Sequence, residues 1–92
     1  MIKGFRHKGL KRFYETGSKA GISADHAKRL RTLLARLDAA SQPEDMDLSG
    51  ARLHPLGGDM EGFWAVNISG NWRLIFRFEG AEALDVDYLD YH

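Results

Sequence analysis

Residues 63–78 read FWAVNISGNWRLIFRF. Large apolar side chains alternate with smaller or polar ones on both sides of a central Ser-Gly-Asn, and a period of two is typical of β-strands. The stretch therefore predicts a hairpin of two strands, residues 63–68 and 72–78. The side chains expected on its core face are Trp64, Val66, Ile68, Trp72, Leu74, Phe76 and Phe78. Those expected on the other face, which we interpret as the working face, are Phe63, Asn67, Arg73, Ile75 and Arg77.

The register of this hairpin follows from keeping the apolar side chains on one face. It sets Ile68 opposite Trp72 and leaves a three-residue loop at 69–71. Farther along, the apolar residues Leu84, Val86 and Tyr88 predict the core face of another strand, with Phe78 opposite Leu84. This register would deliver residues 90–92 next to Asn71 and Arg73.

Two helices are predicted before the hairpin. From about residue 7, Leu10, Phe13 and Tyr14 have the spacing of one helical face, and Gly17 suits the left-handed conformation that ends a helix. Ser23 is a plausible N-cap for a second helix, residues 24–40. Its apolar stripe comprises Ala27, Leu30, Leu33, Leu34, Leu37 and Ala40.

The remaining segments complete an α+β fold. Residues 1–5 predict a short first strand, residues 41–50 a mobile loop, and residues 52–59 a brief strand that runs into a turn rich in Pro and Gly. A chain of 92 residues suffices for one modest core, so residues 1–92 are predicted to form one domain. We expect two N-terminal helices packed on a small, mostly antiparallel sheet.

Composition limits the classes of function. The sequence has no cysteine, which excludes disulfides and thiolate metal sites. No apolar run reaches the length that spans a membrane, and the basic N-terminus lacks the apolar region of a signal peptide. These features predict a cytoplasmic protein without a membrane partner.

The formal net charge of zero hides an asymmetry. Residues 1–36 hold ten Lys or Arg against two acids, whereas residues 37–92 hold three arginines against eleven acids. One interpretation is that the helical half and the sheet half attract each other. The other is a basic surface for a polyanion such as RNA. The basic residues expected to bind RNA are Lys8, Lys11, Arg12, Lys28, Arg29, Arg31 and Arg36.

One set of residues suits phosphodiester chemistry without a metal or cofactor, since the four histidines lack metal-ligand spacing. Its candidate catalytic members are His54, Arg73, Asp90, Tyr91 and His92, and the nearby Asn71 is expected to bind RNA. Cleavage of RNA by its own 2′-hydroxyl needs a base, an acid and positive charge, which imidazole and guanidinium groups supply. Tyr91, Trp72 or Phe63 could stack an unpaired base.

Each of these residues also has a purely structural interpretation. His54 precedes a proline and could hold a loop carbonyl, and His92 could be a frayed terminal residue. Arg73 and Arg77 could pair with Asp85 and Asp87 across the predicted sheet. Only the convergence of the set in one place favours the catalytic interpretation.

From end to end, the sequence closely resembles the HigB-type toxins of the RelE/ParE superfamily. The segments that carry the resemblance are Met1-Ile2-Lys3, His54-Pro55-Leu56, Asn71-Trp72-Arg73-Leu74 and Asp90-Tyr91-His92. The resemblance implies a RelE-like fold and a type II toxin, a ribosome-dependent endoribonuclease that cuts messenger RNA in the ribosomal A site. It also implies neutralisation by a HigA-like antitoxin with a helix-turn-helix domain.

The resemblance assigns roles to the candidate residues. His54 and His92 would transfer protons, Arg73 would stabilise the phosphate, and Tyr91 would orient or stack the substrate, while the basic helices would contact ribosomal RNA. Position 57, usually Lys in this family, is Gly here, which implies a slower enzyme. The alternative is that the chain is a non-catalytic member of the superfamily. It would then be either a ParE-like gyrase inhibitor or an RNA-binding protein that regulates its operon.

Overall fold

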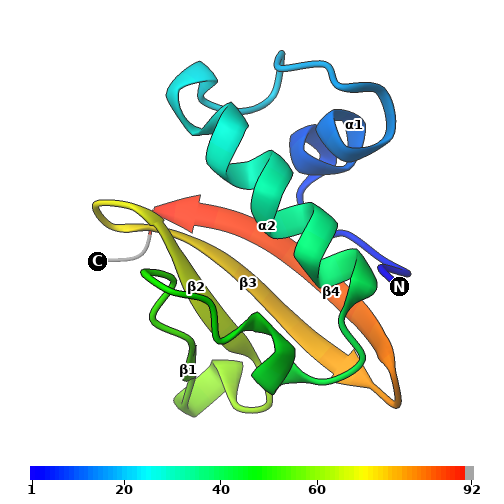
Figure 1. Ribbon diagram of the computed structural model, residues 1–92, viewed down its shortest axis with the longest axis vertical. Coiled ribbons are helices and arrows are strands. Elements are labelled where there is room, and N and C mark those ends of the chain that lie inside the picture. Colours follow the sequence, from blue (N-terminus) through cyan, green and yellow to red (C-terminus); the bar gives the residue numbers. More distant parts are fainter. Residues whose placement is uncertain (91–92) are drawn as a thin grey trace.

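A computed structural model describes residues 1–90, in which helices cover one face of a four-stranded antiparallel sheet (Figure 1). The helices are α1 (Lys8–Thr16) and α2 (Ala27–Ala39). The strands, which follow one another across the sheet, are β1 (His54–Pro55), β2 (Trp64–Ser69), β3 (Trp72–Glu79) and β4 (Glu82–Asp90). Short 3₁₀ turns occupy Ala24–His26, Pro43–Met46 and Gly58–Met60. The predicted fold class is confirmed.

The main core lies between the helices and the sheet. All six residues of the apolar stripe predicted for α2 are buried, as are Val66, Ile68, Leu74 and Phe76 from the sheet. The other three predicted core residues of the hairpin, Trp64, Trp72 and Phe78, are half-buried and pack against this core. The predicted apolar face of the sheet and the predicted apolar stripe of α2 thus pack against each other. Both could be predicted because the periods of strands and helices are local features of the sequence.

The first residues run along the free edge of β4. Lys3 N donates to Ala83 O and Arg6 N donates to Val86 O, each at 2.8 Å, in parallel pairing. The pairing consists of two isolated bridges, at Ile2 and at Phe5, so the predicted first strand is only partly formed. This segment nevertheless covers the exposed edge of β4, which would otherwise present unpaired backbone groups.

The hairpin register differs from the predicted one at its loop. Asn67 pairs with Arg73, but Ser69 rather than Ile68 pairs with Trp72, so Ile68 is the extra residue of a β-bulge. The connecting loop therefore has two residues, Gly70 and Asn71, instead of three. The prediction was wrong because it assumed an unbroken ladder.

A second bulge shifts β4. Leu74 pairs with Tyr88 and Arg73 with Leu89 as predicted, but Phe78 pairs with Ala83 rather than Leu84. Asp85 stands at the shift with a left-handed backbone, φ 52°. Ala83 is therefore buried in place of Leu84, which is only half-buried.

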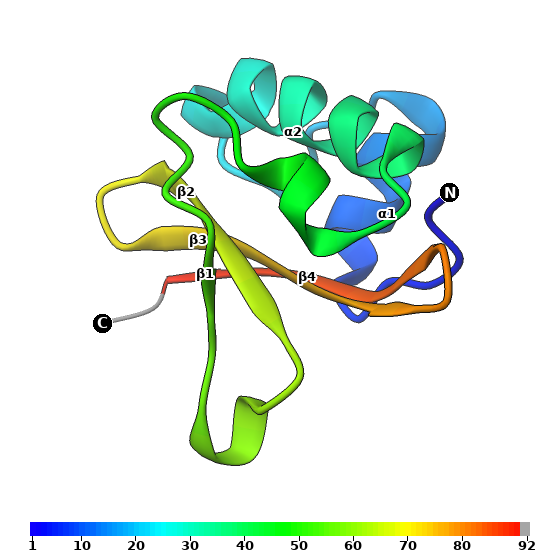
Figure 2. The ribbon, with the colours of Figure 1, turned by 60° about the horizontal axis from the view of Figure 1, so that its bottom comes forward.

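The face of the sheet away from the helices is partly covered. The connection between β1 and β2 extends on this side (Figure 2) and packs Leu56 and Met60 against Phe63, Ala65 and Ile75. Phe63 and Ile75 are therefore buried, although they were predicted to lie on an open working face. This second cluster therefore closes the part of the face that Phe63, Ala65 and Ile75 occupy.

Two local predictions for the helical region were wrong, at Tyr14 and at Ser23. Tyr14 is 38% exposed rather than buried with Leu10 and Phe13. Ser23 makes no side-chain capping hydrogen bond, because the chain enters α2 through a 3₁₀ turn. The predicted loop at 41–50 contains the turn Pro43–Met46, whose Met46 is fully buried and anchors the segment. Gly17 does end α1 in the left-handed conformation, φ 80°.

Gly9 and Gly21 touch backbone to backbone. A Cβ atom built on Gly9 would lie 2.5 Å from Gly21 O and 2.7 Å from Gly21 Cα. We expect Gly9→Ala to destabilise the protein by about 1–3 kcal/mol, because the backbone contact cannot yield without moving α1. Urea unfolding measures the loss. Gly57→Ala is the control, since its Cβ would meet nothing within 4 Å, and equal stability of the two variants would contradict the prediction.

Asp38 ties α2 to the first residues and predicts a pH dependence. Its Oδ1 accepts from Ile2 N at 3.0 Å, and this bond, followed by one from Tyr14, lowers the pKa of the carboxyl. A lowered pKa stabilises the fold above the ordinary value of about 3.9, and the contribution is lost as the pH falls through the lower folded value. Asp38→Asn should cost roughly 1 kcal/mol at pH 7, since the group is partly exposed. The difference between the thermal midpoints of variant and wild type should shrink below pH 4; a constant difference would contradict the assignment.

Candidate functional site

A pocket of about 560 Å³ opens on the sheet near the loop of the hairpin. It is lined by Arg52, Leu53, His54, Asn67 and Arg73. β1 carries His54 opposite Ala65, and the pairing of Asn67 with Arg73 places these two side chains on the same face. Two of the predicted catalytic residues, His54 and Arg73, are thus brought together.

A hydrogen bond to a backbone carbonyl orients the imidazole of His54. Its Nδ1 lies 2.8 Å from Arg52 O. A carbonyl oxygen only accepts, so Nδ1 must carry the proton, and in the neutral ring Nε2 is the unprotonated nitrogen. His54 thus holds a loop carbonyl, as its structural interpretation expected, and the same bond leaves Nε2 as the nitrogen able to take up a proton.

Arg73 is anchored by backbone carbonyls. Its Nη1 donates to Gly70 O at 2.7 Å and to Trp72 O at 3.1 Å. Among residues 1–90, no acidic side chain forms an ion pair with it, so the predicted structural pairing of Arg73 with Asp85 or Asp87 is not present. The guanidinium is oriented by the hairpin loop while it lines the pocket.

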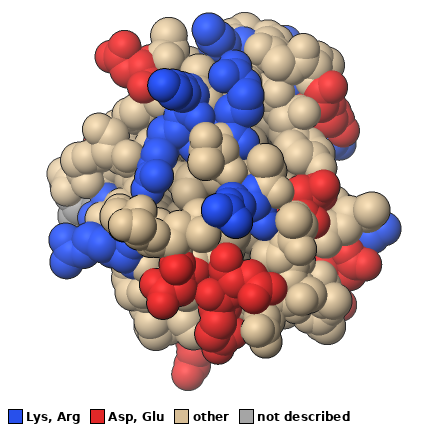
Figure 3. All heavy atoms as spheres, in the orientation of Figure 1, with Lys and Arg blue, Asp and Glu red and all other residues tan. Residues whose placement is uncertain are grey.

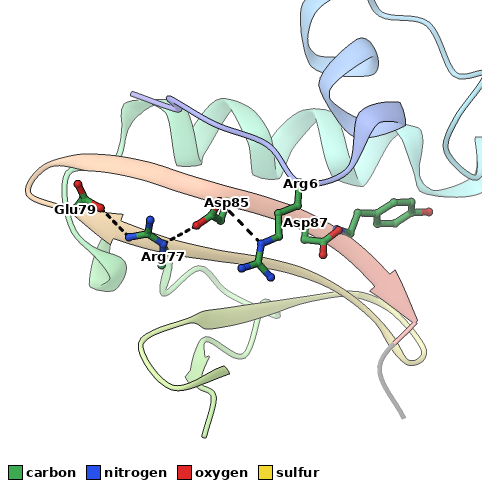
Figure 4. A network of polar contacts seen from close by, with 6 residues as sticks. Arg6, Arg77, Glu79, Asp85 and Asp87 are labelled. Carbon is green, nitrogen blue, oxygen red and sulfur yellow. Dashed lines mark hydrogen bonds and ion pairs between the residues drawn. The ribbon is translucent and has the colours of Figure 1, made fainter. Parts of the chain in front are cut away.

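Arg77, in contrast, is engaged in a polar network on β3 and β4 (Figure 4). Its Nε donates to Asp85 Oδ2 at 2.7 Å and its Nη1 to Glu79 at 3.0 Å, and these bonds raise the pKa of the guanidinium. Arg6 Nε lies 3.9 Å from Asp85 Oδ1 and joins the same network. The structural interpretation of Arg77 is confirmed.

The other candidate residues lie around the end of the sheet. Asn71 is exposed in the hairpin loop. Asp90 is exposed at the end of β4 and pairs with Trp72, which places it beside the residues that flank the loop. Tyr91 and His92 lie outside the described residues. Arg73 pairs with Leu89, as the predicted register required, and the predicted approach of residues 91–92 to Asn71 and Arg73 lies outside the described residues.

Two of the three aromatic residues proposed to stack a base, Phe63 and Trp72, take part in packing, and the third, Tyr91, lies outside the described residues. Phe63 is 8% exposed and belongs to the second cluster. Trp72 stacks on Tyr88 with 4.7 Å between ring centroids, and Tyr88 Oη lies 2.6 Å from His26 Nδ1. Burial raises the pKa of Tyr88. Phe63 and Trp72 therefore stabilise the protein rather than present a free ring.

The basic residues predicted to bind RNA lie on the helices, and all but Arg29 are exposed. Figure 3 shows Lys and Arg gathered over the region of α2, with a cluster of Asp and Glu below them. Arg29 is half-buried and donates to Asn67 O at 3.3 Å, so it links α2 to β2. Arg31 lies over the ring of Phe13 with its Cζ 5.6 Å from the centroid.

A family model described as the RelE-like toxin of type II toxin-antitoxin system HigB matches residues 3–92. The chain belongs to this family. The HigB-like chain is therefore a toxin of a type II toxin-antitoxin system with an antitoxin as its partner, and the predicted resemblance is confirmed.

Two relatives align with the whole HigB-like chain. "Endoribonuclease HigB" of Proteus vulgaris is 39% identical over 92 residues, with 100% of both chains covered. "Toxin HigB-1" of Vibrio cholerae serotype O1 is 32% identical over 94 residues, with 100% of this chain and 98% of the relative covered. The first of these names supports the predicted endoribonuclease.

Two solved structures share the fold at low identity. YafQ from E. coli strain BL21(DE3) has a TM-score of 0.54 and 18% identity, with 95% of this chain and 87% of that chain covered. The YoeB/ParE toxin from Agrobacterium tumefaciens has a TM-score of 0.55 and 16% identity, with 99% and 96% covered. The predicted RelE-like fold of the HigB-like chain is confirmed.

Sequence reasoning missed two residues of the pocket. Asn67 was predicted on the right face but given no role, and its Oδ1 is buried without a hydrogen-bond partner among residues 1–90. Arg52 was regarded only as the start of a brief strand, and its left-handed backbone, φ 53°, leaves no signal in the sequence. In the described part of the HigB-like chain, no three His, Asp or Glu side chains are grouped as metal ligands require, and no helix is long and apolar enough to cross a membrane.

Proposed function

We propose that this HigB-like endoribonuclease toxin cleaves messenger RNA in the ribosomal A site and so inhibits translation in the cytoplasm. A HigA-like antitoxin with a helix-turn-helix domain would neutralise it. The observation that carries the proposal is the pocket in which His54, oriented through its Nδ1, and the anchored Arg73 share one concave surface. A base and a fixed guanidinium at one site are what attack by a 2′-hydroxyl requires.

The reaction uses the substrate's own nucleophile. His54 Nε2 accepts the proton of the 2′-hydroxyl as its oxygen bonds to phosphorus, and the bond from phosphorus to the 5′-oxygen breaks as an acid protonates that oxygen. Arg73 stabilises the negative charge on the other phosphate oxygens. The products are a 2′,3′-cyclic phosphate and a free 5′-hydroxyl.

The remaining candidates complete the proposed site. His92 is the proposed acid, Asp90 and Tyr91 orient the substrate, and Asn71 contacts RNA from the hairpin loop. The exposed basic residues of α1 and α2 are proposed to bind phosphates of ribosomal RNA, which would account for the charge asymmetry of the chain. Arg29 supports this surface from within, because it bonds to β2.

The test incubates the purified protein with messenger RNA, either bare or loaded on ribosomes, and maps the new 5′ ends. The His92→Gln variant is assayed in parallel. We expect cuts only on ribosomes, and we expect them to vanish in the variant. Cuts on bare RNA would remove the ribosome from the proposal, and no cuts in any sample would favour a non-catalytic toxin, with gyrase inhibition as the next measurement.

Gly57 offers a way to raise the rate. It is exposed, its φ is −121°, and a Cβ built on it would meet nothing within 4 Å, so a lysine fits there without strain. A charge-assisted contact to phosphate contributes about 1.5–3 kcal/mol. We expect Gly57→Lys to cleave about tenfold faster or more, and to be more toxic on expression. Gly57→Gln, which lacks the charge, is the control; an unchanged rate in the lysine variant would argue against a phosphate contact at this position.

A further inference from the structure

A second guanidinium lines the pocket beside Arg73. Arg52 lies two residues before His54, and its side chain is exposed and contributes to the wall of the pocket. Within residues 1–90, no acidic side chain forms an ion pair with Arg52, whereas Arg77 on β3 is held by Asp85 and Glu79. The positive charge of Arg52 is therefore available to a ligand in the pocket.

The backbone of Arg52 makes this side chain unexpected. Its φ of 53° is in the left-handed region, which glycine adopts freely and other residues only at a cost. The conformation turns the carbonyl of residue 52 onto His54 Nδ1, at 2.8 Å. Any residue supplies a carbonyl, and glycine would do so with less strain. The orientation of His54 therefore explains the backbone at position 52 but not the guanidinium.

Arg73 alone does not offer all of its hydrogen-bond donors to a phosphate. Its Nη1 donates to two carbonyls of the hairpin loop, Gly70 O and Trp72 O, so part of its hydrogen-bonding capacity serves to hold the side chain in place. Charge that builds up on two non-bridging phosphate oxygens is better matched by two guanidinium groups than by one that is partly engaged. Arg52 and Arg73 line the same pocket as the imidazole of His54.

We propose that the Arg52 guanidinium binds the scissile phosphate together with Arg73 and stabilises the charge that develops during cleavage. This inference rests on the proposed function, because it requires RNA cleavage in this pocket. It assigns two contributions to one residue: the carbonyl of Arg52 fixes the protonated nitrogen of His54, and its side chain contacts the phosphate.

The test compares Arg52→Gln, Arg52→Gly and Arg52→Lys in single-turnover cleavage of a defined messenger RNA on programmed ribosomes. We expect the glutamine and glycine variants to cleave about 10- to 100-fold more slowly, because a hydrogen bond to a charged group is lost. Lysine keeps the charge without the planar fork and should fall between them and the wild type. Lys19→Gln removes one charge from an exposed loop residue outside the proposed site and should cleave at the wild-type rate.

Stability separates a contact to phosphate from a structural role. Arg52→Gly keeps the carbonyl that holds His54 and removes the left-handed strain, so its thermal midpoint should not fall while its rate does. If the wild type cleaves and both uncharged variants cleave equally fast, the inference is wrong and the proposed function stands. If Arg52→Gly cleaves slowly while Arg52→Gln cleaves at the wild-type rate, the side chain acts through packing rather than charge, and the inference is also wrong. If the wild type does not cleave at all, the proposed function fails and the inference with it.

Discussion

Replacement of His54 by asparagine should lower the rate of RNA cleavage by about 10²- to 10⁴-fold, the range that a general acid or base contributes. The amide nitrogen of asparagine takes the place of Nδ1, so it can still donate to Arg52 O, the bond that measures 2.8 Å in the wild type. The variant loses only the equivalent of Nε2. A large loss of rate with little change in the free energy of unfolding would therefore assign the proton transfer to that nitrogen.

Two further variants sharpen this result. His54→Gln places an amide near the position of Nε2 but loses the bond to Arg52 O, so it should be as slow and also less stable by about 0.5–1.5 kcal/mol. His7→Asn is the matched control for the rate, because the Nδ1 of His7 caps α1 by accepting from Leu10 N, which an asparagine oxygen can also do. The ring of His7 also packs edge-on against Tyr88, with 5.3 Å between ring centroids, so this control can lose some stability while it keeps the wild-type rate. Wild-type cleavage by His54→Asn would remove His54 from the chemistry.

The sequence predicted those parts of the fold that depend on short repeats. The stripe of α2, the strand faces of the hairpin and the end of α1 at Gly17 each follow from a local period or a local backbone requirement. The two bulges do not follow from a local period, because each depends on contacts between segments that are distant in the sequence. At Asp85 the left-handed backbone lets both Ala83 and Val86 pair with residues 1–6 while they remain buried.

The site was predictable to the extent that it depends on strand pairing. Arg73 was placed correctly because its pairing with Asn67 survives the bulge next to it. His54 was grouped with Arg73 for its chemistry, and no period placed the two side by side, since β1 has only two residues. Arg52 was missed because a positive φ in a residue other than glycine is imposed by its surroundings. The closed part of the working face was missed because the segment between β1 and β2 has no period that predicts where it folds back.

Replacement of Phe76 by alanine should lower the free energy of unfolding by about 3–5 kcal/mol, the usual cost of a cavity of this size. Phe76 is fully buried in the main core between the sheet and the helices. On the sheet it pairs with Trp64 of β2. A domain of this size has a total stability of about 5–15 kcal/mol, so the variant should unfold at much lower urea concentrations.

Phe78→Ala is the matched control for this experiment. Phe78 lies on the same strand and in edge contact with Phe76, with 6.0 Å between the ring centroids, but it is only half-buried. Its truncation removes less buried apolar area and leaves a site that water can enter. The loss in the free energy of unfolding should therefore be clearly smaller than for Phe76→Ala. If the two variants lose equal stability, the packing of the sheet is not centred on Phe76. The core would then extend toward the β3–β4 turn, where Phe78 pairs with Ala83 beyond the bulge.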